Sequence, residues 1–102
     1  MTDTFTFAAP LWLWDARKGD SWFFITVPPE ISEEIGVRFG ASAAGFGSIK
    51  VEVTVGATTW STSIFPEQQD KYVLPVKKAV RKAEGLEEDT VAKVKLRVTA
   101  PR

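Results

Sequence analysis

The stretch LPVKKAVRKAEGLEEDTV, residues 74–91, carries the clearest pattern in this chain of 102 residues. Its first nine positions hold four cations, and its last eight hold four anions. The apolar residues recur at the spacing of one helix face, so we expect a short amphipathic helix that ends at Gly85, with its cations in water. The residues expected on the inward face are Val76, Ala79, Val80 and Ala83.

The rest of the chain alternates apolar and polar residues with the period of two that is typical of strands. A second short helix is expected to begin at Pro28 and Pro29 and to end at Gly36, because proline suits the first turn of a helix and glycine suits its end. The expected strands are 4–14, 22–27, 48–55, 58–65, 71–76 and 92–98.

The two strand-to-helix regions can be overlaid at an offset of 49 residues. Ile25 then matches Leu74, and Gly36 matches Gly85. Chance matching of apolar residues is the alternative for segments this short. If the repeat is real, each half supplies a ββαβ unit to one closed six-stranded β-barrel, a mainly β fold with two short helices across it. Closure removes exposed strand edges, so we expect a single domain over residues 1–102.

The composition argues against several classes of function. Hydrophobic residues make up 44% of the chain and charged residues 25%, as in ordinary globular proteins. Cysteine and histidine are both absent, which removes disulfides, cysteine zinc sites and the usual general base near neutral pH. We therefore expect no enzyme, no metal and no cofactor. No apolar run approaches the ~20 residues of a membrane span, so a cytoplasmic protein without a membrane partner is expected.

The charge is unevenly distributed although the chain is neutral overall. Residues 1–70 hold four Lys/Arg and nine Asp/Glu, whereas residues 71–102 hold nine and four. Cations of the second helix and of the last strand could form one surface that contacts nucleic-acid phosphates. A merely solvated face is favoured, because the acidic turn beside it would repel phosphates. The cations concerned are Lys77, Lys78, Arg81, Lys82, Lys93, Lys95 and Arg97.

Aromatic residues are abundant, with four tryptophans and seven phenylalanines. Most are expected to fill the barrel, since a small barrel needs bulky side chains. Trp12, Trp14 and Trp60 are our candidates for a ligand-binding surface, because an exposed indole ring can stack on a flat or sugar-like molecule.

The runs GFGSIKVEVTVGATTWSTSIF, residues 45–65, and YVLPVKKAVRKAEGL, residues 72–86, resemble the bacterial domain-of-unknown-function family DUF1905. The resemblance implies a double-split β-barrel related to the AbrB and MazE DNA-binding barrels, and it implies no established activity. Where that family commonly has Gly-Asp, this chain has Glu88-Asp89. Glu88 is therefore expected in a turn conformation that glycine adopts more cheaply.

Together these patterns predict a non-catalytic binding or interaction module, as a monomer or a homodimer. Its partner would be an unknown small molecule or protein. The alternative is a nucleic-acid-binding domain that uses the basic helix and strand.

Overall fold

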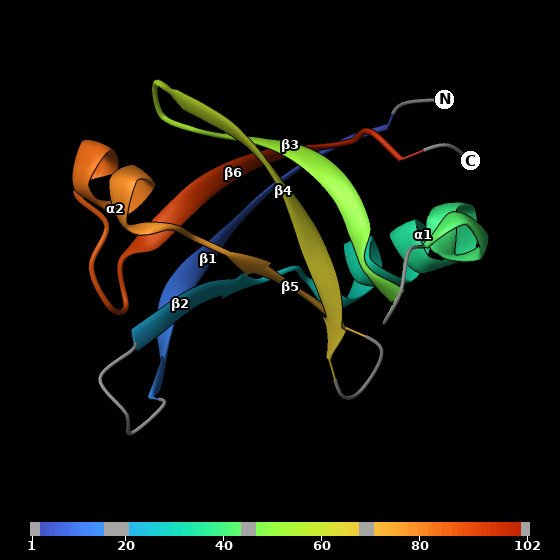
Figure 1. The fold of residues 1–102 in the computed structure, drawn as a ribbon, viewed down its shortest axis with the longest axis horizontal. Helices are drawn as coiled ribbons and strands as arrows, with labels where there is room; N and C mark the ends of the chain where they lie inside the picture. Colours follow the sequence, from blue (N-terminus) through green and yellow to red (C-terminus); the bar gives the residue numbers. More distant parts are fainter. Residues whose placement is uncertain (1–2, 16–20, 44–46, 68–70, 101–102) are drawn as a thin grey trace.

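The structure is a computed structural model that describes residues 3–15, 21–43, 47–67 and 71–100 (Figure 1). Among the described residues, no helix is long and apolar enough to cross a membrane. The elements are β1 (Thr4–Asp15), β2 (Ser21–Thr26), α1 (Pro29–Phe39), the 3-10 helix η1 (Gly40–Ser42), β3 (Ile49–Val55), β4 (Thr58–Glu67), β5 (Lys71–Pro75), α2 (Lys78–Glu84) and β6 (Val91–Val98).

The six strands close into a barrel, as the sequence predicts, and the structure adds that they pair antiparallel in the order β1-β2-β5-β4-β3-β6. Helices α1 and α2 lie at opposite sides of the barrel in Figure 1. Strands β3 and β6 alternate most regularly, because each turns one face to the barrel interior and the other to solvent. The larger side chains that are fully enclosed include Leu11, Ile25, Ile35, Phe39, Ile49, Ile64, Leu74 and Leu96.

The strand register shows the internal repeat. Ile25 of β2 lies directly opposite Leu74 of β5, 49 positions later. The Val27 N–H donates to the Tyr72 carbonyl, and the Val76 N–H donates to the Phe23 carbonyl, both at 2.9 Å. A shift of 49 residues converts either hydrogen bond into the other. Exchanging the two halves also places β1 where β4 lies and β3 where β6 lies in the strand order, although the shift of 49 residues holds only for the β2–α1 and β5–α2 regions. Each half therefore contributes one ββαβ unit.

Helix α1 is longer than expected, since it continues past Gly36 to Phe39. The additional turn carries the Phe39 ring into the core, where it is 1% exposed. Arg38 also pairs with Glu34 one turn earlier, at 2.7 Å. Burial of the aromatic ring and this ion pair extend the helix, and the N–H of Gly40, not that of Gly36, makes the closing bond.

Helix α2 begins at Lys78 and ends before Gly85, as expected to within one residue, but its inward face differs from the expected one. Val76 and Val80 are buried as expected, but Ala79 and Ala83 are exposed. Alanine buries little area and is compatible with either face of a helix. Val80 anchors the helix in the core, and a polar contact adds to this at the helix end. The Glu84 carboxylate accepts a hydrogen bond of 2.6 Å from the Thr58 hydroxyl group.

Two smaller expectations were wrong at element ends. Asp89, not Glu88, adopts the left-handed conformation after α2, with φ at 70°. An aspartate tolerates this region better than most residues, and its N–H is fixed by the Leu11 carbonyl at 2.7 Å. Strand β4 extends through Pro66, which pairs with Tyr72, where a loop was expected.

The buried pair at the centre of the repeat provides a test of the fold. Leu74→Ala is expected to lower the free energy of unfolding by about 3 kcal/mol, because it leaves a cavity in a fully enclosed site. Val37→Ala is the control, since Val37 is 81% exposed on α1, and should change that energy by less than about 0.5 kcal/mol. Urea unfolding followed by tryptophan fluorescence measures both. Equal losses in the two variants would contradict the placement of Leu74.

Candidate functional site

A pocket opens where β4 and β5 separate. These two strands are paired only between Phe65 and Val73, between Pro66 and Tyr72 and between Glu67 and Lys71. Beyond this ladder β4 continues beside β3, while the chain after β5 turns into α2. The opening has a volume of about 770 Å³, which falls within the range of small-molecule sites. Its cationic and aromatic lining consists of Lys77, Lys78, Arg81, Trp22, Phe23 and Trp60.

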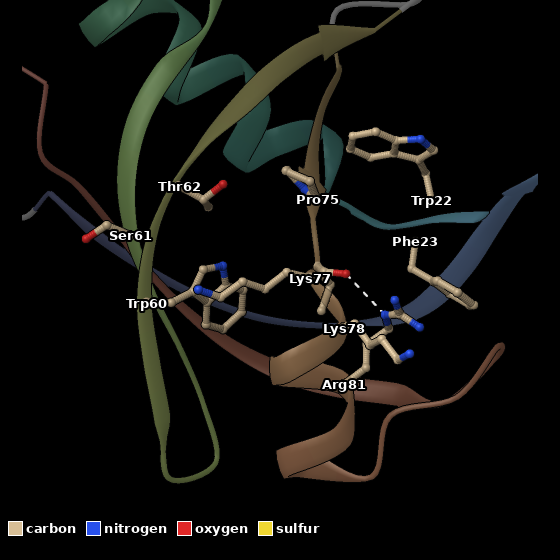
Figure 2. Close-up of a pocket in the computed structure, with 10 residues that line it drawn as sticks. Trp22, Phe23, Trp60, Ser61, Thr62, Pro75, Lys77, Lys78 and Arg81 are labelled. Carbon is tan, nitrogen blue, oxygen red and sulfur yellow. Dashed lines mark hydrogen bonds between the residues drawn. The ribbon is translucent and has the colours of Figure 1, made fainter. Parts of the chain in front are cut away.

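Arg81 is the most firmly held cation of the pocket. Its Nε donates to the Val76 carbonyl at 3.2 Å. Its guanidinium carbon lies 4.0 Å from the centroid of the Phe23 ring, a cation–π contact. Figure 2 shows the Arg81 guanidinium beside Phe23, with the hydrogen bond drawn as a dashed line. One nitrogen and one face of the Arg81 guanidinium are thus occupied. These two contacts fix the direction in which its remaining N–H groups point.

The three cations lack acidic partners within the described residues. The ion pairs found there join Arg38 to Asp3 and Glu34, and Arg97 to Glu52. None involves a lysine or arginine of the pocket, and no described carboxylate lines it. The side chains of Lys77 and Lys78 are exposed. An anion entering the pocket would therefore meet positive charge that no described carboxylate neutralises.

The seven cations considered for one basic surface, the alternative to a merely solvated face, occupy separate places. Lys82 is exposed on α2 and does not line the pocket. Lys93 and Lys95 line a shallower groove over β6 with Thr6 and Thr54. Arg97 is paired with Glu52 at 3.3 Å. Only Lys77, Lys78 and Arg81 converge on the pocket.

The three tryptophans proposed from the sequence also separate. Trp60 lines the pocket from β4 and is 8% exposed. Trp12 and Trp14 lie on the outer side of the β1–β2 hairpin, opposite Phe24 and Trp22 respectively. The Trp12 indole N–H donates to the Thr26 hydroxyl group at 2.9 Å, and its ring centroid is 5.1 Å from that of Phe24. This aromatic surface is shallow and almost wholly apolar.

Sequence reasoning missed Trp22, which lines both the pocket and the outer aromatic surface. Trp22 is 52% exposed. The run WFFITV, residues 22–27, has apolar residues on both faces, a pattern typical of a central strand. A signal was present nonetheless. Trp14 and Trp22 flank the turn between β1 and β2, so an antiparallel register places them opposite each other.

The internal repeat provides a comparison for the pocket. The 49-residue shift relates Lys77, Lys78, Arg81 and Lys82 to Pro28, Pro29, Ser32 and Glu33. The Ser32 hydroxyl group donates to the Val27 carbonyl at 3.0 Å, in the position of the bond from Arg81 to Val76. Ser32 also accepts the Tyr72 N–H at 3.1 Å. The α1 half thus makes the same turn with a small buried hydroxyl group and without a cation.

Comparison with known families agrees with the resemblance noted in the sequence. The family model described as a domain of unknown function, DUF1905, matches residues 7–96. Comparison with curated proteins finds no match.

The aromatic ring at the α1 end gives a pH-dependent prediction. Burial raises the pKa of Tyr72 above its ordinary value of 10.0. A raised folded-state pKa means that the neutral phenol is favoured by folding. Its contribution to stability is therefore complete below the unfolded pKa and is lost as the pH rises through the folded pKa.

Tyr72 is the single tyrosine of the chain, so tyrosinate absorbance reports on this residue alone. We expect its titration midpoint above that of free tyrosine. We also expect the alkaline loss of unfolding free energy to be smaller in Tyr72→Phe. A midpoint at or below the free value would show that the ring is not buried against α1.

Proposed function

The chain belongs to the DUF1905 family, and we propose that it is a non-catalytic binding module whose pocket beside α2 binds a small organic anion. The observation that carries this proposal is the convergence of Lys77, Lys78 and Arg81 on one aromatic-walled opening. Such a site combines a few oriented polar groups with apolar walls, as ligand pockets usually do.

The way in which Arg81 is held supports anion binding. A guanidinium group binds carboxylate or phosphate oxygens through parallel N–H donors. Here its Nε contacts the Val76 carbonyl and one face covers Phe23. Less side-chain entropy is therefore lost when a ligand binds than for a freely rotating arginine.

The internal repeat argues that the cations are not required by the fold. At the corresponding positions the α1 half has Pro28, Pro29 and Ser32. Ser32 makes the backbone contact that Arg81 makes in the other half. The turn before α1 thus has the same backbone contact without positive charge. The cations of the turn before α2 are therefore not needed for the fold, which favours a role in binding.

The non-catalytic part of the proposal rests on the side chains available. A hydrolytic or proton-transfer reaction needs a positioned acid, base or nucleophile. The chain has no histidine or cysteine, and the described lining of the pocket has cations and hydroxyl groups without a carboxylate. These groups bind and orient an anion better than they move a proton.

Nucleic-acid binding is the second candidate, and it includes the proposed relation to the AbrB and MazE barrels. It is favoured by the three pocket cations and by the exposed Trp22, which lines the same pocket. A polyanion, however, requires cations along its whole path. Lys93 and Lys95 line a different groove, and the net charge of the chain is zero. We therefore place it behind a small anion.

A screen of small organic carboxylates, phosphates and sulfonates by thermal shift and calorimetry tests this function. We expect at least one class to bind, and we expect Arg81→Gln to weaken that binding about tenfold or more, because a charge-assisted hydrogen bond contributes ~1.5–3 kcal/mol. Lys78→Gln should weaken it less, since an exposed lysine acts as a screened point charge.

Lys82→Gln is the matched control, because Lys82 is on the same helix but outside the pocket. The Lys82→Gln variant should bind the same anion as tightly as the unmodified chain does. Urea unfolding of each variant separates loss of binding from loss of fold. Equal weakening by the Arg81 and Lys82 substitutions would indicate a general charge effect and refute a specific site.

A further inference from the structure

We infer that the ligand of the α2 pocket is a phosphate monoester that carries a flat aromatic ring. This inference rests on the proposed function and adds the chemical class of the ligand. It is drawn from three features of the pocket: the number of its cations, the free face of one tryptophan, and its size.

The number of cations points to a doubly charged group. A phosphate monoester carries a charge of about −1.5 to −2 near neutral pH and has three strong acceptor oxygens. One arginine satisfies a carboxylate through two parallel donors. This pocket adds Lys77 and Lys78 to Arg81, and no carboxylate in the described part of the chain pairs with any of them. That amount of positive charge matches a dianion better than a monoanion.

Trp22 supplies the surface for a flat ring. Its side chain is half exposed although it lines the pocket. Its ring lies within 12° of parallel to that of Phe24, with the centroids 6.4 Å apart. This contact occupies one side of the indole and leaves area for a second ring. Aromatic stacking on such a surface is favourable for any flat π system.

The dimensions of the pocket allow both groups at once. In Figure 2, Trp60 of β4 and Trp22 of β2 lie on opposite sides, and Lys77 lies between them. Thr62 points from β4 toward β5 in the same view and can offer a hydroxyl group to a ring or linker atom. A volume of about 770 Å³ is far more than a bare phosphate ion requires. It suits a ligand with an anionic end and a flat end.

Calorimetry with the full chain and four probes tests the inference. Adenosine 5′-monophosphate carries both groups, ribose 5-phosphate lacks the ring, adenosine lacks the phosphate, and inorganic phosphate lacks both ring and sugar. We expect the monophosphate to bind about tenfold or more tightly than any of the other three, since stacking of one base on an aromatic side chain contributes about that factor.

Trp22→Leu is the diagnostic variant. It should reduce the affinity for adenosine 5′-monophosphate to that for ribose 5-phosphate and leave the latter unchanged. Trp14→Leu is the matched control, because Trp14 is also half exposed on the same hairpin but does not line the pocket. This control should bind the monophosphate with unchanged affinity.

The outcomes separate this inference from the proposed function. Ribose 5-phosphate could bind as tightly as adenosine 5′-monophosphate, with an affinity that is lowered by Arg81→Gln and not by Trp22→Leu. The anion pocket would then stand, and the aromatic ligand would be refuted. If no probe binds and no anion of the wider screen binds, both fail. A single-stranded oligonucleotide that binds more tightly than the monophosphate, with a steep loss of affinity as salt is raised, would assign the same chemistry to nucleic acid and overturn the free monoester.

Discussion

The pairing of β2 with β5 is the constraint on which the rest of the molecule depends. Ile25 and Leu74 lie opposite each other at its centre and are fully buried. The two backbone hydrogen bonds of Val27 and Val76 continue the pairing to the point where each strand ends. One short ladder therefore determines where both helices begin and, with the separation of β4 from β5, where the pocket opens.

The two halves are also interlocked, because β3 pairs with β4 and β6, which both belong to the other half. Neither half can complete a barrel alone.

The strands could be predicted from the sequence because period-two alternation is enforced by the barrel wall. Val51 and Val53 face inward for the same physical reason that Lys93 and Lys95 face outward. The helix ends and faces were harder to predict. Glycine is common at helix ends, so the sequence predicts an end at Gly36, whereas burial of Phe39 extends the helix to that residue. Helix α2 buries Val80 of its apolar pattern but not Ala79 or Ala83, and its contact with Thr58 across the chain is not visible in a local window.

Some residues that line the candidate pocket could be named from the sequence. The cations of the Lys77–Lys82 region were identified from their density, and Trp60 from its type. That these residues meet in one pocket could not be predicted. It depends on β4 separating from β5 after three paired positions, and no local pattern in the sequence indicates where two strands separate. Trp22 was missed because a strand that is apolar on both faces resembles a buried one. On β2 the outer face carries Trp22 and Phe24 against Trp14 and Trp12, so aromatic stacking replaces the solvent-facing polar residues expected of an outer strand.

Internal duplication offers a physical reason why a small barrel can hold such a site. A turn in which a side chain must satisfy a strand-end carbonyl occurs twice, once with Ser32 and once with Arg81. The serine fulfils that need with a buried hydroxyl group that also accepts the Tyr72 N–H. The arginine fulfils it with one nitrogen of a larger group and keeps further donors beside Phe23. The strand-end carbonyl is satisfied in both halves, and only the half with arginine also places a positively charged group in the pocket. Residues 1–70 and 71–102 differ by ten charge units. Part of this difference lies at the two similar turns, because the turn before α2 carries cations and the turn before α1 does not. The turn before α2 is therefore the one suited to an anion.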